Sequence, residues 1–211
     1  MSQLDEITNA IRQKLEEINT ARDRAYQQSR ELTSLCAKAI RTIHREEWQP
    51  AETLLTQAQQ AAETMVNGLR NYPDLYYAGY TQDALKEYVE GRLVYALIRN
   101  RPLPAPQELG VEDNTWLNGL AEAATELRRR ILDIIRLGHN NEAERLLDNM
   151  DEIYSLLVTF DFNDTITGGL RRRTDTVRGV LERTRGDVTT SFRQEKLERA
   201  LEGVEKFIVT G

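Results

Sequence analysis

The sequence predicts an all-α protein. Apolar residues recur at spacings of three and four over long stretches, and no run alternates apolar and polar residues as a strand would. Of the 211 residues 40% are hydrophobic, and five prolines and twelve glycines are spread along the chain. This length can bury one core, so we expect a single helical domain over residues 1–211. We expect a bundle of about six to seven helices with long N- and C-terminal helices.

The first half of the chain predicts three helices. Pro50 is placed to stand in the first turn of the second helix. Thr81 is a candidate N-cap of the third helix. Residues 71–80 hold four of the eight tyrosines, and we expect a loop that packs a helix junction, although such tyrosines can also stack on unpaired bases. The expected helices span residues 4–45, 50–70 and 81–101.

The second half predicts three more helices after a stiff connector. The run from Arg101 to Pro106 contains three prolines and predicts an extended spacer. Gly138 is expected to end the fourth helix. The last helix has a thin, widely spaced apolar stripe, which is typical of a helix that packs against another subunit; we therefore expect a homo-oligomer. The expected helices span residues 114–137, 141–160 and 170–206.

Charge is distributed unevenly. The net charge of −6 argues against nucleic-acid binding, but residues 22–45 hold six Lys/Arg against two acids, and residues 170–199 hold nine against five. Within the first segment a stripe about 80° wide opposes the apolar face. This basic stripe, which faces either water or phosphate, consists of Arg30, Lys38, Arg41 and Arg45.

The sequence also favours the cytoplasm. Cys36 is the single cysteine, which excludes a disulfide framework and fits a reducing compartment. The N-terminus has no apolar leader, and no apolar run of 18 residues occurs. We therefore expect neither export nor a membrane partner.

Four carboxylates form the candidate site. Glu87 and Glu90 lie about 60° apart on a helical wheel, among core positions, where a carboxylate needs a cation, a metal or a helix end. Glu122 and Glu126 lie one turn apart on the next long helix, and the wheel alone turns them towards solvent. All-oxygen ligands select Mg²⁺, Mn²⁺ or Ca²⁺, and Mg²⁺ or Mn²⁺ held by carboxylates serves phosphodiester hydrolysis. Charged helices also produce this spacing by chance.

Four segments in this order resemble the translin family, especially its archaeal members. The resemblance covers roughly residues 25–205, most of the chain. The segments are SRELTSLCAKAIRTIHR, LKEYVEGRLVYALI, LAEAATELRRRILDIIRLGHNNEAERLLDNMDEIYSLL and GGLRRRTDTVRGVLERTRGDVTTSFRQEKL.

The resemblance implies α-helical bundles that assemble into hollow octamers and bind single-stranded RNA or DNA inside. In the trax branch it further implies a Mg²⁺-dependent acidic site that cuts RNA. Glu87 and Glu90 match the E-x-x-E pair of that branch, Glu126 matches the Glu of its E-L-[MR]-R motif, and Glu122 stands where the family commonly has Asp. The translin branch lacks these acids and only binds.

The sequence therefore supports three hypotheses. The first is an RNA-binding, metal-dependent endoribonuclease in which Glu87, Glu90, Glu122 and Glu126 hold Mg²⁺ or Mn²⁺ and position water, while the basic stripe binds phosphate. The alternative is a non-catalytic shell that binds single-stranded RNA or DNA. A helical adaptor for other proteins is the third.

Overall fold

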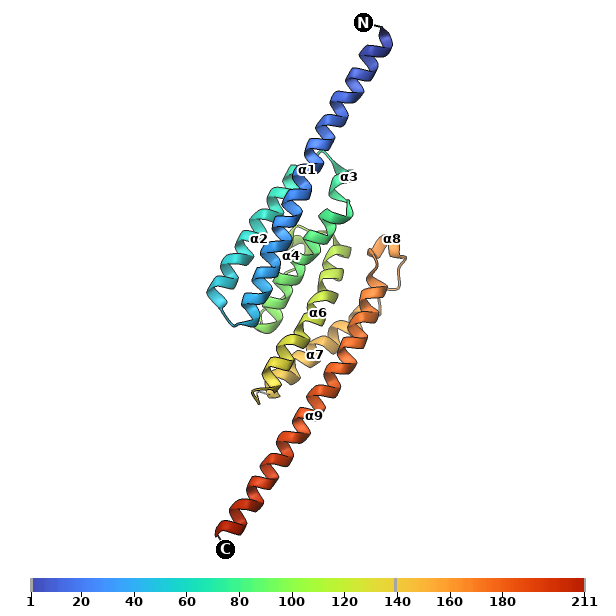
Figure 1. The fold of residues 1–211 in the computed structure, drawn as a ribbon. Helices are drawn as coiled ribbons and strands as arrows, with labels where there is room; N and C mark the ends of the chain where they lie inside the picture. Colours follow the sequence, from blue (N-terminus) through green and yellow to red (C-terminus); the bar gives the residue numbers. More distant parts are fainter. Residues whose placement is uncertain (1, 139, 211) are drawn as a thin grey trace. The chain divides into compact units, whose positions relative to one another are not determined.

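The computed structural model describes residues 2–138 and 140–210 (Figure 1). All regular structure within these residues is helical, which confirms the all-α prediction and the long helices at both ends. The helices are α1 (Gln3–His44), α2 (Trp48–Gly68), α3 (Pro73–Tyr76), α4 (Gly79–Ile98), α5 (Pro106–Leu109), α6 (Asp113–Ile135), α7 (Asn140–Leu157), α8 (Asp164–Thr167) and α9 (Leu170–Thr210).

The helices form two compact units. Unit 1 consists of Met1–Arg92 and Pro104–Gly119, and unit 2 of Leu93–Leu103 and Leu120–Gly211. The continuous helices α4 and α6 each contribute residues to both units. The single domain expected from the sequence stays a prediction.

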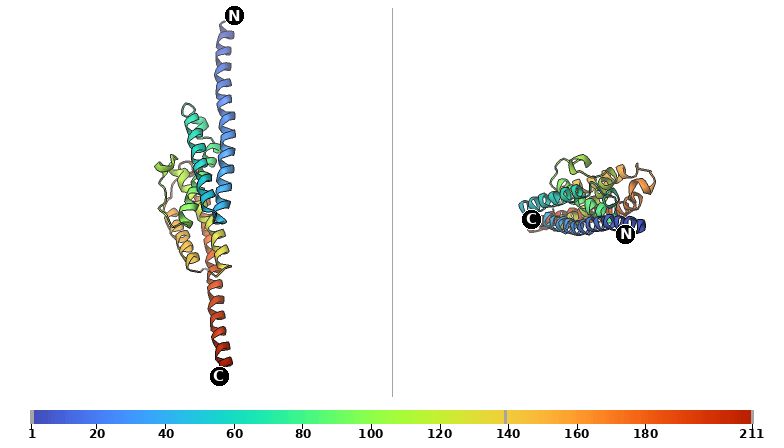
Figure 2. Two further views of the ribbon diagram at one scale, coloured as in Figure 1. Left: turned by 90° about the vertical axis from the view of Figure 1, so that its left-hand side faces the viewer. Right: turned by 90° about the horizontal axis from the view of Figure 1, so that it is seen from above.

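In unit 1, α1 and α2 pack side by side, and α1 extends past α2 at its N-terminal end (Figures 1 and 2). A capping box begins α1: the Ser2 hydroxyl accepts from the Asp5 amide, and the Ser2 amide donates to the Asp5 carboxylate. Glu46, with φ at 60°, makes the tight turn into α2. The predicted boundaries of both helices are accurate to within two residues. The buried face of the second half of α1 includes Leu32, Cys36, Ala39 and Ile43.

The junction between α2 and α4 differs from the sequence prediction. Residues 71–80 include the short helix α3, and α4 already begins at Gly79. The prediction of Thr81 as an N-cap is therefore wrong. Its hydroxyl instead donates to the carbonyl of Leu75 at 2.8 Å, which ties α4 to the end of α3.

In unit 2, α7 and α8 pack against α9. The guanidinium of Arg145 on α7 donates to the carbonyls of Leu97 and Ile98, so it satisfies backbone acceptors at the C-terminus of α4. The segment between α7 and α9 contains α8, and Gly168 and Gly169, both with positive φ, connect α8 to α9.

The outer halves of α1 and α9 carry exposed apolar side chains. Figure 2 shows α9 extending past α7 at its C-terminal end. On α9 only the first part of the predicted apolar stripe is buried, through Val177, Leu181 and Val188. The exposed side chains are Leu4, Ile7, Ile11 and Leu15 on α1, and Phe192, Leu197, Leu201 and Val204 on α9. Within the part of the chain that the structure describes, no helix has the length and apolarity needed to cross a membrane.

The start of α6 packs very closely on α4 within unit 1. A Cβ atom added to Gly119 would lie 2.5 Å from Cγ1 of Val89 and 3.1 Å from the carbonyl oxygen of Lys86. No side chain fits there unless the two helices move apart. A glycine is thus required at position 119 because α6 and α4 approach each other so closely there.

We expect Gly119→Ala to lower the free energy of unfolding by about 1–3 kcal/mol, because the added methyl overpacks a backbone contact. Gly179→Ala, on α9 with open space around the glycine, is the matched control and should raise stability by about 0.5–1 kcal/mol. Denaturant unfolding followed by circular dichroism measures both changes. Equal stabilisation by both substitutions would contradict the close contact.

Candidate functional site

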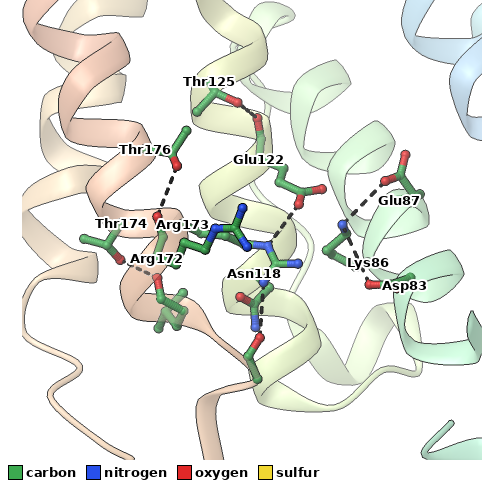
Figure 3. Close-up of polar contacts among 12 residues, drawn as sticks. Asp83, Lys86, Glu87, Asn118, Glu122, Thr125, Arg172, Arg173, Thr174 and Thr176 are labelled. Atoms are coloured by element: carbon green, nitrogen blue, oxygen red, sulfur yellow. Dashed lines mark hydrogen bonds and ion pairs between the residues drawn. The ribbon is translucent and has the colours of Figure 1, made fainter. Parts of the chain in front are cut away.

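The two acids predicted on α4 differ in burial. Glu90 is only 9% exposed, whereas 29% of the Glu87 side chain is exposed. The ammonium of Lys86 lies 3.5 Å from the Glu87 carboxylate and 4.0 Å from that of Asp83 (Figure 3). The prediction that the pair faces inward therefore holds fully for Glu90 and partly for Glu87, which has a lysine beside it.

The negative charges of Glu87 and Glu90 affect the pKa of Cys36, on the buried face of α1. Burial, followed by the charges of Glu87 and Glu90, raises the pKa of the Cys36 thiol to about 12. On the same stretch of α4, a Cβ on Gly91 would lie 3.6 Å from Leu55 and 3.9 Å from Ile40, so α4 packs against α1 and α2. The acids are thus part of a packed helical face.

Helix α6 carries the third acid, Glu122. Its first turns pack against Val89 and Lys86 at Gly119, and the helix continues without a break to Ile135. Glu122 follows Gly119 by three residues, which places it about one helical turn beyond the contact. Glu122 therefore lies on the same unbroken helix as the glycine that makes this contact.

The carboxylate of Glu122 is held by an arginine. Nε of Arg173, near the start of α9, donates to Oε1 of Glu122 at 3.0 Å, and Nη1 of the same guanidinium donates to the carbonyl of Gly168 at 3.1 Å (Figure 3). About a quarter of each side chain is exposed, 27% for Arg173 and 26% for Glu122. Glu122 is thus anchored to the α8–α9 turn.

The wheel-based placement of Glu122 and Glu126 in solvent is wrong. Both residues are half-buried on α6. A wheel measures direction around one helix and does not include the helices that cover its outer side. Here α9 supplies Arg173 to that side, so the face away from the core of α6 is polar and enclosed in part.

The basic stripe is exposed along the second half of α1. Arg30, Lys38, Arg41 and Arg45 are all exposed, and they alternate along α1 with buried Leu32, Cys36, Ala39 and Ile43. The stripe is thus accessible within unit 1. Whether it binds phosphate stays a prediction.

Similarity to known proteins was found along nearly the whole chain. No family model matches it. An uncharacterized protein of Methanocaldococcus jannaschii, MJ0175, is 29% identical over 208 residues, which cover 97% of this chain and 90% of that protein.

Solved structures decide the family. AfC3PO, solved alone and in complex with duplex RNA, is similar with a TM-score of 0.83 and 33% identity over 89% of this chain and 97% of the AfC3PO chain. The chain belongs to the translin/trax family. NeC3PO without ligand, at 24% identity and a TM-score of 0.78, covers 90% of this chain and 98% of its own and shares the fold.

The tyrosines of this translin/trax-family chain mainly pack the junction, as favoured from the sequence. The Tyr76 hydroxyl donates to the Glu112 carboxylate at 3.1 Å, and burial, then Glu112, raises the pKa of Tyr76 to about 12. Tyr80 meets Tyr26 of α1 edge to face, with ring centroids 5.7 Å apart. Tyr77 is exposed at 63%, although its ring contacts that of Tyr76.

Two cations at the acids were not identified from the sequence. Lys86 is adjacent to Glu87 in the chain, but consecutive residues of a helix point in different directions. The sequence therefore did not predict the contact between their side chains. Arg173 is the last of three consecutive arginines; the structure leaves Arg171 and Arg172 exposed and half-buries Arg173. Only the position of α9 relative to the rest of unit 2 distinguishes them.

Proposed function

We propose that this protein binds single-stranded or short RNA and hydrolyses its phosphodiester bonds with Mg²⁺ or Mn²⁺. The observation that carries the proposal is the set of carboxylates on α4 and α6, in a chain that is 33% identical to a protein solved with duplex RNA. The match of Glu87, Glu90 and the Glu126-Leu-Arg-Arg129 run to the trax pattern supports the nuclease branch.

Carboxylate geometry supports a divalent ion. Glu87, Glu90 and Glu122 each offer one oxygen, and these oxygens lie within 4.8 Å of one another. Two ligands on opposite sides of one Mg²⁺ ion are separated by about 4.2 Å, twice the usual Mg–O distance of about 2.1 Å. The spacing of the oxygens therefore fits one ion after small side-chain movements.

The four acids have distinct proposed roles. Glu87, Glu90 and Glu122 would hold the ion, which when bound activates water and neutralises charge on the phosphate. Glu126, one turn along α6, is not part of that group of three within the described residues. We assign it to the orientation of water or to a second ligand position, as the trax pattern implies.

Replacement of Glu87 and Glu122 together by alanine should slow cleavage strongly. We expect labelled single-stranded RNA to be cut by the wild type in Mg²⁺ or Mn²⁺ and at least about 10²-fold more slowly by this variant, since a metal contributes several kcal/mol to phosphoryl transfer. Asp83→Ala on α4, whose side chain is 70% exposed, is the control. Cleavage at the wild-type rate in the double variant or in EDTA would eliminate the metal site.

A binding shell without catalysis is the second candidate. The contact of Lys86 with Glu87 and that of Arg173 with Glu122 favour it, because each supplies a positive charge that an ion would otherwise provide. This candidate predicts RNA or single-stranded DNA binding without turnover. It also predicts normal binding after the double substitution, so the same assay separates the two functions.

The basic stripe should carry part of the RNA affinity. We expect Arg41→Ala/Arg45→Ala to weaken binding of single-stranded RNA and to reduce the dependence of log Kd on log salt by about 0.7 for each phosphate that the protein no longer neutralises. Arg12→Ala/Lys14→Ala, on the first half of α1, removes the same charge from exposed positions. Fluorescence anisotropy over a series of salt concentrations measures both variants. Equal effects of the two pairs would show that only net charge matters.

We further propose that copies of the chain assemble into a homo-oligomer through the exposed apolar residues of the outer halves of α1 and α9. The family resemblance implies that this homo-oligomer is an octamer. Leu197→Glu/Leu201→Glu should lower the mass measured by light scattering at micromolar concentration, because two charges enter an apolar contact. Thr189→Glu/Thr190→Glu, at exposed positions of α9, is the control. A wild-type monomer mass would contradict the assembly.

A further inference from the structure

Arg173 is hydrogen-bonded to a side chain and to the backbone within unit 2. Its Nε donates to the Glu122 carboxylate and its Nη1 to the carbonyl of Gly168. The second contact holds the guanidinium against the turn between α8 and α9, where Gly168 and Gly169 have positive φ. The backbone of that turn thus fixes the arginine, and the arginine fixes the carboxylate.

The choice of arginine fits this double contact. A guanidinium presents five N–H donors in a rigid plane, so one side chain can bind a carboxylate and a carbonyl at once in fixed directions. A lysine ammonium on its flexible stem has no such fixed geometry. A carboxylate has two oxygens and about four acceptor positions, so Glu122 can accept from Arg173 and still ligate an ion.

We propose that Arg173 is a positioning residue that sets the orientation of Glu122 towards the divalent ion, an inference that rests on the metal site proposed above. Glu122 has one more methylene, and therefore one more rotatable bond, than the aspartate common at this place in the family. The hydrogen bond from Arg173 removes that extra freedom. The longer side chain thereby becomes a defined ligand.

The sign of one measurement separates positioning from simple charge. Arg173 is a cation beside a proposed cation site, so its removal should strengthen Mn²⁺ binding if only its charge mattered. A positioning role predicts the opposite, because an unrestrained Glu122 would lose ligand geometry. Loss of a group that orients a metal ligand typically weakens metal affinity by about 10–100-fold.

The experiment is a Mn²⁺ titration of the full-length protein by isothermal calorimetry. We expect Arg173→Ala to raise the Kd for Mn²⁺ by about tenfold or more. Arg178→Ala is the matched control: it removes the same side chain from the same helix, where it pairs with Glu182 at 61% exposure of each side chain. The control should leave the Kd unchanged. Circular dichroism confirms equal helicity of both variants.

A double-mutant cycle tests whether Arg173 acts through Glu122. In a Glu122→Ala background, Arg173→Ala should have no further weakening effect, since the group to be positioned is absent. Arg173→Lys, which keeps the charge but not the planar fork, should bind Mn²⁺ more weakly than the wild type and more tightly than Arg173→Ala. An unchanged or lower Kd for Arg173→Ala in the wild-type background overturns the proposal.

The two proposals fail in different ways. If Mn²⁺ binding by the wild type equals that of Glu87→Ala/Glu122→Ala, the metal site itself is wrong and the role of Arg173 falls with it. If Mn²⁺ binding depends on Glu87 and Glu122 but not on Arg173, the metal site stands and only the positioning role is wrong.

Discussion

The close packing of α6 on α4 at Gly119 is the constraint on which the candidate site depends. A single methyl group there would lie 2.5 Å from Val89, so the two helix backbones can approach only because the side chain is absent. An α-helix rises about 1.5 Å per residue, which puts Glu122 about 4.5 Å further along the axis of α6. The contact between the start of α6 and α4 in unit 1 is therefore determined by a glycine that takes no part in any chemistry.

Burying an acid creates an electrostatic requirement. A carboxylate as buried as Glu90 is costly without compensating charge or hydrogen bonds. Lys86 places positive charge at Glu87 in unit 1, and Arg173 places positive charge at Glu122 in unit 2. A divalent ion meets the same requirement with a doubled charge. If the proposed ion binds, it competes with these protein cations for the carboxylates, and the free-energy difference between the two arrangements decides between the binding shell and the nuclease.

Local periodicity was sufficient to predict the helices, because amphipathic spacing and caps are properties of one segment. The beginning of α1, Pro50 in the first turn of α2 and the glycine after α6 all follow from such signals. Properties that need a neighbour were not predictable in this way: Thr81 lies inside α4 and bonds the end of α3. For the site, the family pattern identified Glu122 against the helical wheel, whereas nothing local distinguished Arg173 from the two arginines before it.

The lengths of the helices explain why apolar side chains stay exposed at the chain ends. With 42 residues α1 is about 63 Å long, whereas α2, with 21, spans only about 32 Å. Half of α1 therefore extends past its partner, and exposed Leu4, Ile11 and Leu15 lie on that half. Burial of each such side chain is worth about 1.5–3 kcal/mol, and unit 1 offers nothing to cover them. The basic stripe occupies the other half of α1. Contacts between copies through the outer half of α1 would thus leave the basic stripe accessible to RNA.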